Sequence, residues 1–220
     1  MPPSTIHQPP SRLHAIVDVD ASTNAGLIPL DVARAFLDGG APVLQLRAKI
    51  LGSRAFLELA DGCVALARAR GAVIIINDRI DIARVSRADG VHVGQDDVPP
   101  AAARQILGEA AIVGFSTHTL EQVEAAVREP VSYIAVGPVF GTRSKETGYD
   151  AVGLTLVSAA ARLAGSVPVV AIGGITIENA SSALAAGAAS VAVIGALVAG
   201  GHPEQRTRAF LERLADNTND

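Results

Sequence analysis

Eight short apolar runs recur along the chain, and longer alanine-rich stretches separate them. This alternation restricts the possible folds more than any other feature of the sequence. Short runs rich in Val and Ile are typical of parallel strands that are buried on both faces. The sequence therefore predicts strands over residues 13–18, 43–47, 73–77, 90–94, 112–116, 133–137, 169–173 and 190–195.

The stretches between these runs have the composition and the ends of helices. Pro203 suits the first turn of a helix, where a missing N–H group is not needed, and Gly108 suits a helix end. The predicted helices cover residues 30–38, 53–70, 80–86, 99–107, 120–128, 154–163, 177–186 and 204–215.

Strands and helices that alternate without a linker predict a single (β/α)8 TIM barrel, an α/β fold. The length of 220 residues fits one such domain. A doubly wound open sheet is the alternative, but eight regular units favour closure into a barrel. We expect the barrel over residues 12–216, a flexible arm over residues 1–11 and a loose tail over residues 217–220.

The composition argues against several classes of protein. With five Phe, two Tyr, no Trp and a net charge of −4, the chain lacks the features of a nucleic-acid binder. Its only cysteine, Cys63, excludes an intramolecular disulfide and a multi-cysteine zinc site. We find no secretory signal and no membrane-spanning run, so we expect a cytoplasmic protein without a membrane partner. These features are also compatible with assembly into a homo-oligomer.

Polar residues gather just after the carboxyl ends of the predicted strands. In (β/α)8 barrels these ends carry the chemistry, whereas the opposite ends serve stability. A chance distribution would use both ends, so the one-sided clustering indicates an enzyme. The residues are Asp18, Gln45, Arg47, Lys49, Asn77, Asp78, Asp97, Ser116 and His118, with the loop 137–153 and the glycines Gly173, Gly174 and Gly195.

The second predicted strand delivers two cations to this end. Gln45 and Arg47 are two residues apart, so both point into the barrel mouth, and Lys49 continues the line. A planar guanidinium beside an ammonium suits an anion with several oxygens. The alternative is a rim ion pair with Asp78 or Asp97.

Asp78 and Asp97 follow adjacent strands and can meet in the mouth. Mg²⁺ in proteins takes one or two carboxylates and completes its shell with water and phosphate oxygens. Together with Arg47 and Lys49, the two carboxylates predict a Mg²⁺–pyrophosphate site. Taken singly, each aspartate could instead cap the helix that follows it.

The glycines after the last two strands predict a second, uncharged anion site. Backbone N–H groups at Gly173, Gly174 and Gly195 can approach a phosphate closely, as in many barrels of this type. The alternative is a set of tight strand–helix turns without a ligand. Two anion sites fit two phosphorylated substrates, or one substrate with phosphates at both ends.

The remaining reactive side chains have simpler interpretations. His14 and His92 lie inside apolar runs, so we expect both to be buried and hydrogen-bonded. Cys63 lies in an alanine-rich helix and is expected to serve packing. His118, beyond the fifth strand, is the only histidine that we consider as an acid or base.

With these residues located, the chain resembles the thiamine-phosphate synthase family from about residue 13 to residue 210. The resemblance rests on an ordered set of motifs, each modest alone and specific together. They are QLRAK at 45–49, IND at 76–78, ADGVHVGQDDVP at 88–99, GFSTHT at 114–119, GPVFGTRSK at 137–145 and PVVAIGGI at 168–175.

The resemblance implies an enzyme that joins hydroxymethylpyrimidine pyrophosphate to thiazole phosphate, giving thiamine phosphate and pyrophosphate with Mg²⁺ as cofactor. It implies that Asp78 and Asp97 hold Mg²⁺, and that Lys145, Ser116 and Arg47 are catalytic. The pyrimidine substrate would contact Gln45, Arg47, Lys49, Asn77, Ser116 and Lys145, and the thiazole phosphate would contact Thr142, Ser144, Gly174, Ile194 and Gly195.

Two positions depart from the family pattern, both on the thiazole side. Gly141 stands where the family usually has Pro, and Gly195 where it commonly has Ser. A thiazole tautomerase, similar to this family and sharing the His118 position, is one alternative function. A non-catalytic binder of thiamine precursors is the other. The combination of two cations with two carboxylates favours the synthase over both.

Overall fold

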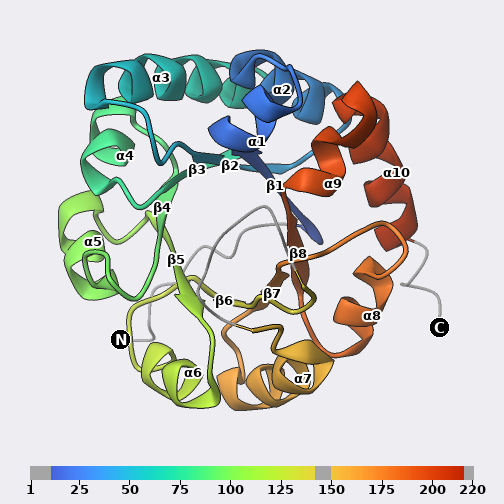
Figure 1. The fold of residues 1–220 in the computed structure, drawn as a ribbon. Helices are drawn as coiled ribbons and strands as arrows, with labels where there is room; N and C mark the ends of the chain where they lie inside the picture. Colours follow the sequence, from blue (N-terminus) through green and yellow to red (C-terminus); the bar gives the residue numbers. More distant parts are fainter. Residues whose placement is uncertain (1–10, 142–149, 216–220) are drawn as a thin grey trace.

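The computed structural model describes residues 11–141 and 150–215 of the chain, and these form the predicted (β/α)8 barrel (Figure 1). Eight parallel strands close in sequence order, because Leu13 on the first strand pairs with Val191 on the last. The open-sheet alternative is therefore wrong. The strands are β1 (Leu13–Asp18), β2 (Val43–Arg47), β3 (Val73–Asn77), β4 (Gly90–Val93), β5 (Ile112–Thr117), β6 (Tyr133–Val136), β7 (Val169–Ile172) and β8 (Ser190–Val193).

Helices surround the barrel, and the eight predicted ones are confirmed with small shifts at their ends (Figure 1). They are α2 (Pro29–Asp38), α3 (Ser53–Ala69), α4 (Ile80–Ser86), α5 (Pro100–Leu107), α6 (Leu120–Ala126), α7 (Gly153–Ala164), α8 (Ala180–Ala185) and α10 (Pro203–Ala215). The largest shift is at α8, which starts three residues late because the Asn179 side chain accepts a hydrogen bond from the Thr176 N–H and forms a turn first.

Two short helices were not predicted. These are α1 (Val19–Asn24) and α9 (Gly195–Val198), each placed directly after a strand, and a 3-10 turn (Ala199–Gly201) follows α9. Neither is long enough to show a helical period in the sequence. The Asp18 carboxylate caps α1 by accepting a hydrogen bond of 2.8 Å from the Ala21 N–H.

Alternate residues of each strand face either the helices or the barrel interior. The outward residues join the main hydrophobic core with the buried faces of the helices. The inward apolar residues form a second, smaller cluster that fills the lumen, so the barrel is a packed core and not a pore. This inner cluster consists of Ile16, Val43, Ile75, Ile112, Tyr133, Ala135, Val170 and Ala192.

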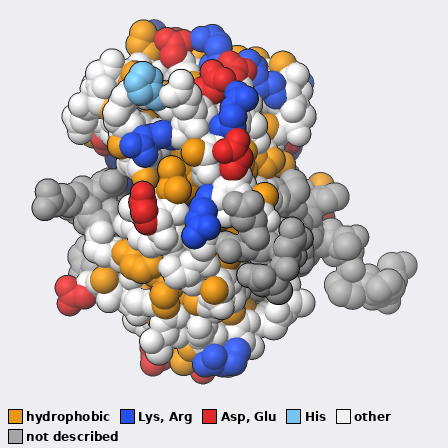
Figure 2. All heavy atoms as spheres, turned by 90° about the vertical axis from the view of Figure 1, so that its right-hand side faces the viewer, with side chains coloured by type: hydrophobic (Ala, Val, Ile, Leu, Met, Phe, Trp, Pro, Cys, Tyr) orange, Lys and Arg blue, Asp and Glu red, His pale blue; other side chains and the backbone are white. Residues whose placement is uncertain are grey.

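The outer surface carries its charge unevenly. On the side formed by α8, α9 and α10, charged side chains gather in the upper part of the view, where α10 lies, and are fewer below (Figure 2). Helix α10 buries Phe210 and Leu214 and turns its charged side chains outward. Among the described residues, no helix combines the length and apolar character needed to cross a bilayer. The predicted arm and tail lie, apart from Ser11, outside the described residues.

Candidate active site

The carboxyl ends of β2, β3 and β4 bring the predicted ionic residues together, and we call this region the charged half of the mouth. Gln45 and Arg47 both point inward, as predicted. The Arg47 Nη1 forms an ion pair with the Asp18 carboxylate, whose side chain is only 1% exposed. Asp18 and Arg47 are register partners on adjacent strands. Asp18 is thus a site residue to which the sequence analysis gave no role.

The second cation of the charged half is also paired. Lys49 Nζ forms an ion pair with an Asp78 oxygen, and the lysine side chain is 49% exposed. The rim ion pair, which the sequence analysis left as an alternative, is therefore confirmed for these two residues. An exposed pair of this kind contributes little stability, so its partners can exchange at little cost. Asn77, at the end of β3, is buried beside them.

The two carboxylates of the charged half lie within hydrogen-bonding reach of each other. Burial raises the pKa of Asp78, the Lys49 ammonium lowers it, and the neighbouring Asp97 raises it again, so the balance lies above the ordinary value. Neither aspartate caps the following helix. No side chain caps α4 or α5, and Asp97 instead accepts a hydrogen bond of 2.7 Å from the Gly94 N–H. The capping alternative is wrong for both.

The backbone at Asp78 adopts a conformation that is unusual for a residue with a side chain. Its φ is +62°, in the left-handed region. Outliers of this kind cost about 1–3 kcal/mol and persist where the surrounding structure enforces them, often at functional sites. Here the Asp78 N–H donates to the His92 carbonyl at 2.7 Å, which fixes the turn and aims the carboxylate at the mouth.

The charged half fits a divalent cation. The neighbouring Asp97 raises the pKa of Asp78, and a cation between the two carboxylates would relieve this repulsion. Within the described ranges no group of three or more His, Cys, Asp or Glu side chains converges. Mg²⁺ does not need such a group, since two carboxylates, water and substrate phosphates complete its shell.

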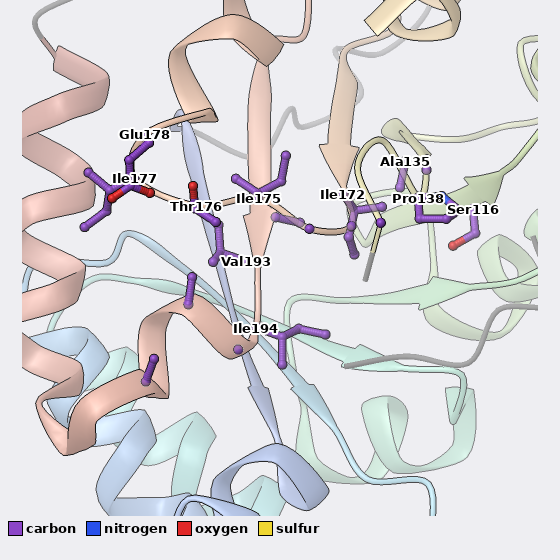
Figure 3. Close-up of a pocket in the computed structure, with 18 of the residues that line it drawn as sticks. Ser116, Ala135, Pro138, Ile172, Ile175, Thr176, Ile177, Glu178, Val193 and Ile194 are labelled. Carbon is purple, nitrogen blue, oxygen red and sulfur yellow. The ribbon is translucent and has the colours of Figure 1, made fainter. Parts of the chain in front are cut away.

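A cavity of about 490 Å³ opens on the other side of the mouth, at the ends of β5 to β8 (Figure 3). We call this side the neutral half. Ser116 lies at one side of the cavity and Thr176 at the other, with Ile194 between them (Figure 3). The predicted residues Ser116, Gly174, Ile194 and Gly195 all line it. The predicted residues Thr142, Ser144 and Lys145 lie outside the described residues.

The two adjacent glycines of the neutral half line the cavity, and close packing also requires a residue without a side chain at both positions. Gly173 and Gly174 have φ of +100° and +65°. A Cβ at Gly173 would lie 2.6 Å from Pro138, and one at Gly174 would lie 2.8 Å from the Cβ of Phe140. Tight strand–helix turns therefore explain why both positions are glycine. Both residues also line the cavity, where their backbone is open to an anion.

Three ionisable residues line the cavity of the neutral half: His118, Glu178 and Arg206. His118 lines the cavity, and its Nδ1 lies 2.6 Å from the Gly137 carbonyl. Because a carbonyl only accepts, Nδ1 carries the proton in the neutral ring. Arg206, from α10, is the only Lys or Arg among the described residues that line the cavity, and its Nε donates to the Ala199 carbonyl at 2.6 Å. The sequence analysis missed Arg206, since it follows no strand.

The buried histidines differ from each other. His92 hydrogen-bonds both Tyr133 and Ser116, as expected. His14 is buried, but neither of its ring nitrogens has a hydrogen-bond partner in the described part of the chain, so that half of the expectation is wrong. Burial lowers the pKa of His14 to about 4. Cys63 is buried in the core, which raises the pKa of its thiol to about 12 and agrees with a packing role.

The fold and the cavity at its mouth together define a protein of the (β/α)8-barrel enzyme class. The family model described as thiamine monophosphate synthase matches residues 13–197. A thiamine-phosphate synthase from Roseiflexus castenholzii is 44% identical over 92% of this chain and 88% of its own length. One from Chlorobium luteolum is 43% identical over 90% and 91%.

The solved structures agree with the sequence relatives. A thiamine phosphate pyrophosphorylase from Pyrococcus furiosus superposes with a TM-score of 0.84 at 28% identity, covering 94% of this chain and 97% of its own. The chain therefore belongs to the thiamine monophosphate synthase family.

Proposed function

We propose that this chain is a thiamine-phosphate synthase, which joins hydroxymethylpyrimidine pyrophosphate to thiazole phosphate. The observation that carries this proposal is the division of one mouth into a charged half and a neutral half. Arg47, Lys49, Asp78 and Asp97 suit a pyrophosphate, whereas the neutral cavity suits a ring that carries one phosphate. The names of the relatives support the same reaction.

In this proposal the pyrophosphate leaves from the pyrimidine methylene, and the bonding electron pair goes to the departing oxygen. The electron-rich aminopyrimidine stabilises the resulting cation, and the thiazole nitrogen then donates its lone pair to form the new C–N bond. No side chain has to act as nucleophile. The protein has to neutralise the leaving charge and hold the two rings together, which is electrostatic stabilisation and proximity.

The residues of the charged half take the first of these tasks. Arg47 and Lys49 would bind pyrophosphate oxygens, with Gln45 and Asn77 beside them. Asp78 and Asp97 would hold Mg²⁺, which when bound supplies positive charge against the pyrophosphate. A phosphate that approaches Lys49 competes with Asp78 for the ammonium, and so frees the carboxylate for the cation.

The neutral half takes the second task. Gly174, Ile194 and Gly195 would receive the thiazole phosphate on backbone N–H groups, and Ser116 would lie between the two substrates. The positions Thr142, Ser144 and Lys145 belong to the same proposal, with the first two on the thiazole phosphate and Lys145 on the pyrophosphate.

Turnover of the purified protein tests the proposal. Both substrates and Mg²⁺ are supplied, and thiamine phosphate is measured by its conversion to fluorescent thiochrome. We expect turnover that depends on each substrate and stops in a chelator. A folded protein that forms no thiamine phosphate would contradict the proposal. Isomerisation of the thiazole phosphate would then support the tautomerase, with His118 as its acid–base group. Tight binding without any reaction would support the binder.

A further inference from the structure

A chain of buried polar side chains crosses the barrel lumen beneath the cavity. Tyr133 on β6 reaches across to His92 on β4, where the hydroxyl lies 3.0 Å from Nδ1. The other ring nitrogen of His92, Nε2, lies 2.8 Å from the Ser116 hydroxyl on β5. Gln45 on β2 is the fourth member, because its side chain lies close enough to the Tyr133 hydroxyl to lower the pKa of that group. We call these four residues the lumen chain.

The barrel is shaped to hold the lumen chain. The inward residue of β5 one layer below Ser116 is Gly114, and a Cβ there would overlap the Tyr133 ring and the His92 Nδ1. Because the φ of Gly114 is not in the left-handed region, the position needs space and not a special conformation. The two rings stack with centroids 5.5 Å apart and planes inclined by 19°. Only a missing side chain at Gly114 allows this contact.

The hydrogen bonds of the lumen chain can all donate in one direction, from Gln45 toward Ser116. A neutral imidazole donates through one nitrogen and accepts at the other, so the partner at Nδ1 determines what Nε2 can do. Burial raises the pKa of Tyr133. The interaction with Gln45 lowers it, as expected of an amide N–H that donates to the phenolic oxygen. With its oxygen occupied by this donor, Tyr133 is able to give its own proton to Nδ1.

We propose that Tyr133 and His92 are positioning residues for Ser116. Tyr133 donates to Nδ1, the His92 ring carries its proton on Nε2, and Nε2–H donates to the Ser116 oxygen. The Ser116 proton then turns into the cavity, which the residue lines. Ser116 is thereby fixed as a donor, and the substrate atom that it meets is an acceptor, either a pyrimidine ring nitrogen or a pyrophosphate oxygen. The inference rests on the proposed function.

The first test is Tyr133→Phe, which removes one hydroxyl and keeps the ring. Without the Tyr133 proton at Nδ1, the ring can carry its proton there and accept from Ser116 at Nε2, and the serine proton turns away from the cavity. We expect kcat to fall by about tenfold, the equivalent of one oriented hydrogen bond. The KM of each substrate should change by less than about twofold, because the residue touches neither. Ser86→Ala, which removes another buried hydroxyl on α4, should leave kcat unchanged.

A double-mutant cycle separates positioning from general destabilisation. In a Ser116→Ala background, Tyr133→Phe should lower kcat by less than about twofold, because the group it positions is gone. An equal loss of kcat in both backgrounds would overturn the proposal. His92→Gln and His92→Leu form a second pair. The glutamine amide can still donate toward Ser116, so it should retain more activity than leucine.

The tautomer of His92 can be measured without turnover, which keeps this inference distinct from the proposed function. Nitrogen-15 NMR of the ring, at a pH where it is neutral, should show the proton on Nε2 in the wild type. In Tyr133→Phe the signals should shift toward the Nδ1–H form or a mixture. A wild-type ring protonated on Nδ1 would refute the lumen chain, whatever reaction the protein catalyses. If the tautomer is as proposed but no thiamine phosphate forms, only the proposed function fails.

Discussion

In the proposed function, the two halves of the mouth bind anions by different means. The charged half uses side chains, and its cations Arg47 and Lys49 are paired with Asp18 and Asp78. A ligand there must compete with carboxylates, so its binding depends on salt and on any cation that neutralises them. The neutral half uses a preformed cavity with glycine backbone in its wall. Its geometry is fixed by packing, since a side chain at Gly173 or Gly174 would meet Pro138 or Phe140.

This contrast assigns separate tasks to the two halves. In the proposed reaction the leaving pyrophosphate gains charge, and positively charged side chains and a metal would stabilise it. A thiazole phosphate keeps its charge and has only to be held in place, for which a rigid cradle is sufficient. Variants of one half should therefore leave the substrate of the other half largely unaffected.

The largest effect is expected for Asp78→Asn in the charged half. Loss of one carboxylate removes a ligand for the cation, and we expect kcat to fall by about 100-fold or more. Asn tolerates the left-handed backbone at this position, so the fold should persist. Thiamine phosphate formation at saturating Mg²⁺ measures the loss. The matched control is Asp81→Asn, which removes an exposed carboxylate paired with Arg79 and should leave kcat unchanged.

Removing the partner of Arg47 tests the buried side of the charged half. Asp18→Asn keeps the cap on α1 but leaves the guanidinium without its counter-charge, and we expect unfolding to become easier by about 3 kcal/mol. Urea denaturation measures this change. Asp31→Asn, in an exposed pair with Arg34, should cost less than about 0.5 kcal/mol. Equal effects of the two variants would show that the Arg47–Asp18 pair is not buried as described.

We expect acid pH to lower the free energy of unfolding, because the buried His14 then becomes protonated. Its pKa in the folded protein is about 4, below the ordinary value of 6.5, so the unfolded state binds the proton more readily. The stability that His14 contributes is complete above pH 6.5 and is lost as the pH falls toward 4. This loss reaches about 3 kcal/mol. His14→Phe should flatten this part of the pH profile of unfolding, and an unchanged slope would contradict the assignment.

The smallest effect is expected at the outer end of the neutral half. Arg206→Gln removes the one cation among the described cavity residues and should raise the KM for thiazole phosphate about fivefold. The KM for the pyrimidine substrate should stay within about twofold. Arg208→Gln, on the same helix and paired with Glu204, is the control and should change neither value. A rise in both KM values for Arg206→Gln would mean that the two halves are not independent.

The sequence predicted the barrel because its signal is local and repeated. The bounds of β2 and β3 agree with the predicted runs, since an apolar run between polar ends leaves little freedom. The helices α1 and α9 escaped prediction because four to six residues show no period. Their positions follow instead from caps and turns that form only when the strand ends are in place.

The positions of several predicted residues at the barrel mouth could be read from the sequence, but the ion pair of Arg47 could not. Arg47 and Asp78 lie at the mouth, where they were expected, and the ligands assigned to them stay a prediction. The pairing of Arg47 with Asp18 depends on strand register. A signal existed, because both residues end adjacent parallel strands. No comparable signal pointed to Tyr133. Its reach to His92 depends on the space left by Gly114, a contact between three strands that no local pattern contains.

Binding of each substrate alone, measured by calorimetry with Mg²⁺ and then with a chelator, tests the division of the mouth most directly. We expect the affinity for the pyrimidine pyrophosphate to fall by at least about tenfold without Mg²⁺. The affinity for thiazole phosphate should change by less than about twofold, since its cradle contains no carboxylate pair. An equal loss for both substrates, or no loss for the pyrophosphate, would contradict the account.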